Sequence, residues 1–273
     1  MRLLLPIALL AACARDPARG KGVVSLLPSF TEIVLALGEG ERLVGCTAYC
    51  RPGRDVTRLP WQDASAAEAI LRVGPALVLK QAPRTPEDPL KAALQRADVR
   101  VLSFPSETIE DVRAAILGLG DALGRRATAE AYLGRFDAEL DAARAFSAGR
   151  EAPSVLFVTR RSAGAVANID AAGPGTFLDE LIRAAGGRNV LADVDAPYPT
   201  ISLETFVRRA PQVIIDNLPA EEDPLDAWGK FAAQVPAVRD RRVFAVRDAA
   251  LLIPGPRLPE AVRRLAEMIH GRP

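Results

Sequence analysis

The chain has 273 residues, 49% of them hydrophobic and 25% charged, which is enough for a real hydrophobic core and comfortable for two domains. Its formal net charge is +1, which argues against nucleic acid or an anionic membrane surface as a partner. The single histidine, His270 near the C-terminus, excludes a histidine-rich metal site and argues against a histidine-dependent catalytic triad. Since the sequence also lacks phosphate- and dinucleotide-binding glycine motifs, it points to binding rather than catalysis.

The N-terminus has the pattern of an export signal. Arg2 precedes an apolar run, Leu3–Ala12, which is too short to span a bilayer and is typical of a secretory signal. Leu10-Ala11-Ala12-Cys13 resembles the cleavage box of bacterial lipoproteins, in which the cysteine is acylated and becomes the mature N-terminus. We therefore predict a signal and polar tether over residues 1–21, with a lipid anchor on Cys13. An ordinary secretory signal with an incidental cysteine is the alternative.

The first half of the chain alternates between strand and helix patterns. An apolar strand at Val23–Leu27 is followed by a helix that ends at Gly38, and a second strand starts near Leu43. Trp61 and Gln62 fall in a loop.

Cys46 and Cys50 lie close together in the segment CTAYC. An exported protein can hold a disulfide, but four residues of extended chain span about 13 Å, more than a disulfide tolerates between its Cα atoms. A bridge would require a turn between the two cysteines, and we favour two free thiols.

One segment occurs twice. Glu68–Leu79 (EAILRVGPALVL) and Glu204–Ile215 (ETFVRRAPQVII) share a glutamate, an apolar pair, an arginine, a proline and an apolar triplet at the same spacing. Because the residue before a proline is disfavoured in the α region, each copy predicts a short helix, a break and then a strand. The apolar triplets are typical of strands that are covered on both faces.

Two further pairs of segments repeat in the same order. Glu32–Gly38 matches Glu180–Gly186, and Arg100–Phe104 matches Arg242–Val246. Between the two halves, apolar residues recur at helical spacing, which predicts one long amphipathic helix over 125–148. The repeats therefore predict two related α/β lobes, at 22–124 and 149–273, joined by that helix.

Three segments carry a resemblance to a known family. They are VVSLLPSFTEIVLALGEGERLVGCTAYC near the N-terminus, SAAEAILRVGPALVL, and Gly255-Pro256-Arg257 before the last predicted helix. Together they resemble the helical-backbone substrate-binding proteins of ABC importers, over essentially the whole chain from Gly22. The resemblance implies two Rossmann-like lobes joined by one long rigid α-helix, with the ligand cleft between the lobes. It implies ligand binding without catalytic residues, a metal site or a resident cofactor.

Within this family the chain is most similar to cobalamin-binding proteins, which place aromatic side chains against the corrin and its lower base. The matching positions here are Tyr49, Trp61 and Tyr198, and Gln81 stands where some relatives carry an aromatic residue. Arg257 is expected to donate hydrogen bonds to the ligand. The resemblance thus implies that the transported ligand is cobalamin, a large chelate.

A ferric siderophore or haem is the alternative ligand. Arg84, Arg160 and Arg161 could also face the cleft, where several arginines would suit an anionic siderophore as well as cobalamin. Haem requires an axial ligand such as tyrosine, and Tyr49 could serve.

The resemblance also implies a partner and a location. In this family each lobe presents a glutamate to arginines on the importer's membrane subunits, and the matching positions are Glu68 and Glu204. Helix capping is the alternative role, since Glu68 could complete a capping box with Ser65, although Glu204 does not fit that pattern. We expect the protein in the cell envelope, on the periplasmic face, held by the lipid on Cys13. A cytoplasmic nucleotide-dependent enzyme would require that Leu3–Cys13 is not an export signal.

Overall fold

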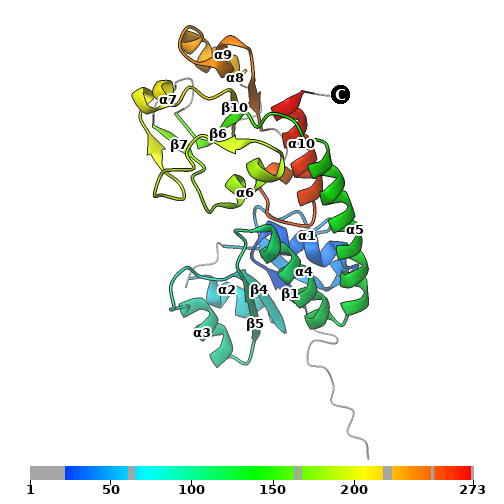
Figure 1. Cartoon of the computed structure of the whole chain (residues 1–273). Helices are drawn as coiled ribbons and strands as arrows, with labels where there is room; N and C mark the ends of the chain where they lie inside the picture. The colour runs from blue at the N-terminus through cyan, green and yellow to red at the C-terminus, as the bar shows by residue number, and fades with distance from the viewer. Residues whose placement is uncertain are drawn as a thin grey trace, which may run out of the picture.

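The chain forms two α/β lobes that lie one above the other and are joined along one side by the long helix α5 (Arg126–Ala145) (Figure 1). The computed structural model describes residues 22–60, 65–162, 166, 168–217, 223–246 and 249–271. The predicted α/β fold, with two lobes and a connecting helix, is confirmed.

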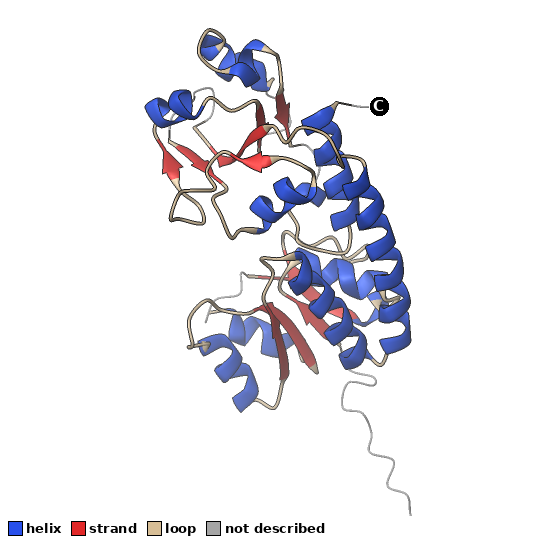
Figure 2. Ribbon diagram, in the orientation of Figure 1, coloured by secondary structure: helices blue, strands red, loops and turns tan. Residues whose placement is uncertain are grey.

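The N-terminal lobe contains a five-stranded sheet in which all neighbouring strands are parallel, in the order β3-β2-β1-β4-β5. Helices pack on this sheet as the alternating strand and helix pattern predicts (Figure 2). The elements of this lobe are β1 (Val23–Ser25), α1 (Pro28–Ala36), η1 (Gly40–Arg42), β2 (Leu43–Thr47), β3 (Thr57–Leu59), α2 (Ala66–Val73), β4 (Leu77–Gln81), α3 (Pro89–Arg96), β5 (Arg100–Phe104) and α4 (Ile109–Leu123).

The C-terminal lobe is less regular. Its central strands β6, β10 and β11 are parallel, but β7 runs antiparallel to both β6 and β9, so this sheet is mixed. The elements of this lobe are β6 (Ser154–Arg160), β7 (Ile169–Ala171), α6 (Phe177–Ala184), β8 (Arg188–Asn189), β9 (Thr200–Ile201), α7 (Leu203–Arg209), β10 (Val213–Asp216), α8 (Pro224–Trp228), η2 (Gly229–Phe231), α9 (Pro236–Arg239), β11 (Val243–Ala245), η3 (Ala249–Leu251) and α10 (Leu258–His270).

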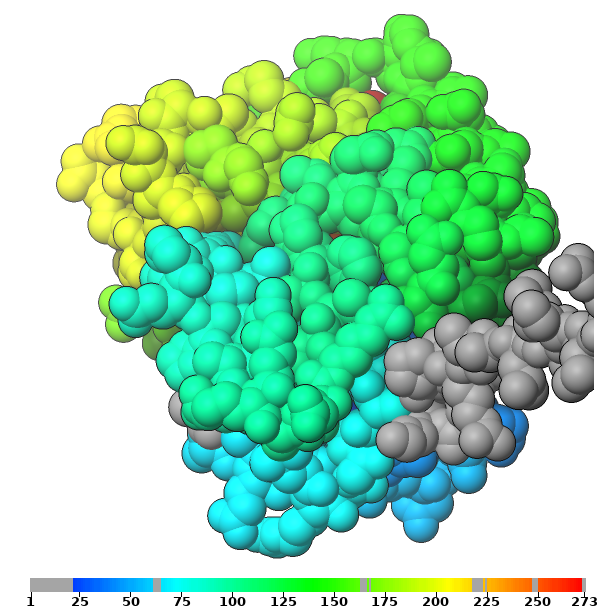
Figure 3. Space-filling view, turned by 90° about the horizontal axis from the view of Figure 1, so that it is seen from below, coloured from blue at the N-terminus to red at the C-terminus, as the bar shows by residue number. Residues whose placement is uncertain are grey.

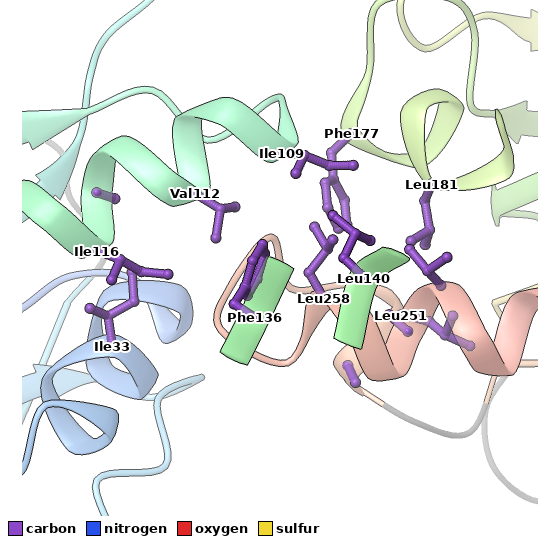
Figure 4. Close-up of a cluster of buried hydrophobic side chains, with 14 of the residues drawn as sticks. Ile33, Ile109, Val112, Ile116, Phe136, Leu140, Phe177, Leu181, Leu251 and Leu258 are labelled. Carbon is purple, nitrogen blue, oxygen red and sulfur yellow. The ribbon is translucent and has the colours of Figure 1, made fainter. Parts of the chain in front are cut away.

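A single hydrophobic cluster extends from one lobe into the other. Phe136 and Leu140 of α5 are buried in it, together with side chains from α1 and α4 of the N-terminal lobe and from α6 and α10 of the C-terminal lobe. Figure 4 shows that Ile109 of α4 and Phe177 of α6 lie side by side in this cluster. The lobes therefore share part of their core along α5.

The surface view from below gives the outline of the molecule (Figure 3). Helix α5 (green) borders the N-terminal lobe on one side, and the part of the C-terminal lobe that contains α7 (yellow) projects on the other. In the described part of the chain, no helix combines the length and apolar character needed to cross a bilayer.

The repeated segment folds as predicted in both lobes. Each copy forms a helix, α2 or α7, which ends before the proline, and then a buried strand, β4 or β10. The two helix ends share a left-handed backbone conformation, with φ of 67° at Gly74 and 43° at Ala210. Only the first copy has the glycine that adopts this conformation without strain.

This difference yields a matched pair of substitutions. We predict that Ala210→Gly raises the free energy of unfolding by up to about 1 kcal/mol, because it removes a Cβ from a left-handed position. Gly74→Ala should lower it by a similar amount, since the added Cβ would meet no atom within 4 Å and only the backbone is strained. Urea unfolding of the two variants measures both values, and changes of the same sign would contradict this origin of the strain.

Candidate functional site

The loops of the N-terminal lobe that face the C-terminal lobe follow the carboxyl ends of its parallel strands. Leu27 lies just after β1, Tyr49 just after β2, and Gln81 is the last residue of β4. The strand order changes direction between β1 and β4, because β2 pairs with the other edge of β1. Ligands of open α/β sheets bind at such a crevice, outside the carboxyl ends of the strands.

A cavity of about 410 Å³ lies between the lobes at this position. The exposed aromatic ring of Tyr49, 74% accessible, forms part of its wall. Ligand pockets combine an apolar lining with a few polar groups, and this cavity has that composition. Its residues are Leu27, Pro28, Ser29 and Tyr49 from the N-terminal lobe and Leu252, Ile253 and Pro254 from the C-terminal lobe.

A polar group of side chains occupies a second part of the same edge. The Gln81 amide donates a hydrogen bond to the Ser106 hydroxyl at 2.8 Å, which fixes an amide at the end of β4. The Arg84 guanidinium forms an ion pair with Glu107 at 2.7 Å, also after the ends of β4 and β5. The sequence-predicted Gln81 is therefore placed at the strand edge, although its side chain is engaged with Ser106.

Tyr198 of the C-terminal lobe lies close to the Arg84–Glu107 pair of the N-terminal lobe. Partial burial raises the pKa of Tyr198 above its usual range, and the Glu107 carboxylate acts in the same direction while Arg84 opposes it. Two backbone hydrogen bonds attach its loop to the end of β7 and the turn that follows: the Ala171 N–H donates to the Pro199 carbonyl and the Gly173 N–H to the Pro197 carbonyl. Tyr198 remains 44% exposed, so each lobe presents one accessible tyrosine.

Arg257 lies at the start of α10 and contacts the opposite lobe. Its guanidinium forms an ion pair with Glu32 of α1 at 3.0 Å, so the structure brings it to a carboxylate rather than to the wall of the cavity. The Tyr132 hydroxyl of α5 donates to the Pro256 carbonyl beside it. Its role in ligand binding remains a prediction.

The other arginines considered for the cleft are also paired. Arg160 forms an ion pair with Asp170 at 2.6 Å. Arg161 is buried against Asp216 at 2.8 Å, and the Trp228 indole donates to the same carboxylate oxygen. Each of these guanidinium charges is thus opposed by a carboxylate of the chain itself.

Cys46 and Cys50 are both free and buried below the Tyr49 loop. The Cys50 amide donates to the Thr47 carbonyl, which forms the turn that a disulfide would require. Burial, and then the nearby Cys50, raise the pKa of Cys46 to about 11, although the Arg58 guanidinium opposes this shift. Both cysteines are thus free thiols in this structure, and burial favours the protonated form of Cys46.

Glu68 and Glu204 both lie on exposed first turns, with side chains that are 81% and 87% accessible. Each forms an ion pair with the arginine four residues later, at 2.7 Å to Arg72 and 3.5 Å to Arg208. The capping box considered for Glu68 is incomplete, because the Ser65 side chain makes no capping hydrogen bond. Both carboxylates face outward from equivalent positions of the two lobes.

Trp61 and Cys13 lie outside the described residues. Sequence patterns did not identify the apolar cavity walls at Leu27, Leu252 and Ile253, since single apolar residues in loops carry no periodic signal. Among residues 22–60, 65–162, 166, 168–217, 223–246 and 249–271, no group of three or more His, Cys, Asp or Glu side chains is arranged to hold a metal ion.

Comparisons with known proteins agree with this architecture. A model of the periplasmic binding protein family matches residues 23–250. A cobalamin-binding protein of Halobacterium salinarum is 28% identical over 266 residues, which cover 91% of this chain and 69% of that protein. The periplasmic haem-binding protein BhuT, solved with two haems, is 32% identical with a TM-score of 0.77, over 91% of this chain and 97% of that one. Apo RhuT from Roseiflexus sp. RS-1, a periplasmic haem-binding protein, is 29% identical with a TM-score of 0.79, over 92% and 98%.

Proposed function

Because the chain belongs to the periplasmic binding protein family, we propose that it captures a corrinoid such as cobalamin in the cleft between its lobes. It is a binding protein rather than an enzyme, acts outside the cytoplasm, and has the membrane subunits of an ABC importer as its partners. The bound corrinoid would be delivered to those subunits without any covalent step. The proposed ligand contacts are Tyr49, Trp61, Gln81, Tyr198 and Arg257.

The observation that carries this proposal is an apolar cavity between lobes that each present an accessible tyrosine. Tyr49 and Tyr198 supply broad and rigid contact area at a low cost in conformational entropy, because each ring has only two rotatable bonds. A corrin is large, flat and partly apolar, which suits contact with such rings. The Gln81 amide at the strand edge suits the amide side chains of such a ligand.

The pairing of the arginines favours a corrinoid over an anionic ferric siderophore. Arg84, Arg160 and Arg161 each form an ion pair with a carboxylate of the chain, so the cleft offers little net positive charge. For Arg161, whose ion pair with Asp216 is buried, loss of the carboxylate to a polyanionic ligand would be costly. An amide-bearing corrinoid of low net charge does not impose this cost.

Haem remains a second candidate, supported by one feature of the site. Tyr49 is exposed beside the apolar cavity, where its phenolate could bind iron. Tyr198 is less suited to that role, because partial burial and Glu107 raise its pKa and disfavour the phenolate. The similar solved proteins BhuT and RhuT bind haem, which makes a direct comparison of the two ligands necessary.

We further propose that Glu68 and Glu204 contact arginines on the two importer subunits. Both carboxylates are exposed, and the shared core along α5 joins the two lobes that carry them. An intermolecular pair would replace the weak surface pairs with Arg72 and Arg208, each worth only about 0.3–0.5 kcal/mol. Acylation of Cys13 would keep the protein beside this partner.

Titration with cyanocobalamin, haemin and a ferric siderophore tests the ligand. We expect calorimetry to give the tightest binding for cyanocobalamin, and Tyr49→Ala to weaken it by about 2 kcal/mol, roughly thirty-fold, through loss of the ring contact. Tyr49→Phe is the matched control, because it keeps the ring and removes only the hydroxyl. Strong haemin binding that Tyr49→Phe abolishes, without cobalamin binding, would replace the corrinoid proposal by the haem one.

A transport assay in reconstituted vesicles tests the docking residues. Glu68→Arg combined with Glu204→Arg should abolish uptake and leave ligand affinity unchanged, because both side chains project from outer helices. Arg72→Ala with Arg208→Ala is the matched control, since it keeps both carboxylates and should preserve uptake. Normal uptake by the glutamate double variant would disprove their role.

Mass spectrometry of the membrane-associated protein tests the anchor. We expect an acylated N-terminal Cys13, and Cys13→Ser should release the protein from the membrane fraction. An unmodified mature N-terminus at another residue would favour the ordinary secretory signal.

A further inference from the structure

Two glutamates at equivalent positions of the repeat each contact the opposite lobe. Glu32 on α1 and Glu180 on α6 occupy matching positions of the internal repeat. Helix α1 follows β1, the first strand of the N-terminal lobe, and α6 follows the antiparallel pair β6 and β7 at the start of the C-terminal lobe. Neither residue is part of the cavity wall or of the exposed docking pair.

Glu32 contacts the start of the last helix of the C-terminal lobe. Its two carboxylate oxygens accept from Arg257, at 3.0 Å from Nη2 and 3.5 Å from Nε, and its side chain is only 21% accessible. The backbone beside this pair is close to α1, because a Cβ on Gly255 would lie 3.3 Å from Glu32 Oε2 and 3.4 Å from Ser29 Cα. The loop that leads into α10 is therefore pressed against α1.

Glu180 makes the corresponding contact in the other direction. Its carboxylate accepts from the backbone N–H of Ile109 at 2.7 Å, and Ile109 is the first residue of α4 in the N-terminal lobe. The same helix start is capped from its own lobe by Thr108 and Asp111. The positive end of the α4 dipole thus receives a second carboxylate, supplied by the opposite lobe.

The two contacts are related by the internal repeat. Helices α4 and α10 each follow the last strand of their lobe, β5 or β11, and each receives a glutamate from the other lobe at its N-terminal end. Both contacts also flank the shared hydrophobic cluster, in which Ile109 of α4 and Leu258 of α10 are buried. Charge-assisted hydrogen bonds of this kind are stronger than neutral ones and lose more when one partner is removed.

We propose that Glu32 and Glu180 form a two-point interlobe clasp that sets the separation of the lobes and so keeps the ligand cavity preformed. They are positioning residues and do not contact the ligand. The Glu32 contact lies beside the cavity, because Ser29 and Pro254, which line it, are within a few residues of Glu32 and Arg257. The expected effect on ligand release rests on the proposed corrinoid binding. The expected effect on the distance between the lobes does not depend on any ligand.

Distances between the lobes test the clasp in the ligand-free protein. Spin labels at Gln95→Cys on α3 and Asp226→Cys on α8, both exposed, report the lobe separation by pulsed electron resonance, while Cys46 and Cys50 are buried. Glu32→Ala with Glu180→Ala should broaden the distance distribution and shift it to longer values. An unchanged distribution with a lower unfolding temperature would overturn the proposal, because the glutamates would then stabilise the fold only.

Two further variants distinguish loss of the clasp from a general loss of stability. Glu180→Gln keeps an acceptor for the Ile109 amide and should retain the narrow distribution. Glu32→Arg with Arg257→Glu restores attraction across the lobes and should recover it, whereas Glu32→Arg alone should not. Failure of the exchanged pair to recover the distribution, with the protein folded, would count against the clasp.

Ligand kinetics provide the second arm. We expect the double alanine variant to release cyanocobalamin about ten-fold faster or more, with the association rate changed little, because the cavity is no longer held together. If wild-type protein binds no cyanocobalamin, the corrinoid proposal fails, and the distance measurement alone decides on the clasp. Faster release without any change of the lobe distances would overturn the clasp.

Discussion

Both lobes bury apolar side chains against the same helix, and this shared core is the constraint on which the rest of the structure depends. Phe136 and Leu140 of α5 lie in one cluster with Ile116 from the N-terminal lobe and Leu181 from the C-terminal lobe. Exposing this cluster costs about 2.5 kcal/mol for every hundred Å² of apolar surface. A large opening of the lobes would expose such surface, so the lobes are expected to move little relative to each other. In a protein whose lobes are joined by flexible strands, the same opening would expose mainly the linking strands and little apolar core.

This limited movement determines how the cleft can bind a ligand. Tyr49 and Tyr198 are carried by loops of different lobes, and the lobes themselves are joined by the shared core along α5. A cavity that exists before the ligand arrives loses less of the contact energy to the ordering of loops. The same feature restricts the ligand to molecules wide enough to contact both lobes without closure, which agrees with a large rigid chelate.

The sequence predicted the parts of the fold that depend on local patterns and missed those that depend on distant pairings. The helix, proline and strand of the repeated segment were recognisable because each is determined by neighbours within a few residues. Strands β7 and β9, three and two residues long, are too short to show a period, so the antiparallel part of the second sheet was not foreseen. Arg257 was expected at the ligand and is found on Glu32, a partner 225 residues away that no local pattern reveals. The hydrogen bond from Gln81 to Ser106 was missed for the same reason, because Ser106 follows a different strand and lies 25 residues away in the sequence.

The internal repeat contains two pairs of equivalent glutamates, one exposed to solvent and one in contact with the opposite lobe. The two pairs relate the width of the cleft to the outer surface of the protein. Glu68 and Glu204 begin helices that face solvent, whereas Glu32 and Glu180 reach across to the other lobe. If the inner pair sets the separation of the lobes, it also sets the separation of the outer pair, because each lobe carries one member of both. The width of the cleft and the distance between Glu68 and Glu204, which face a two-subunit membrane partner, then change together. A ligand that changed the width of the cleft by even a small amount would also change the distance between Glu68 and Glu204. The partner could then distinguish loaded from empty protein without contacting the ligand.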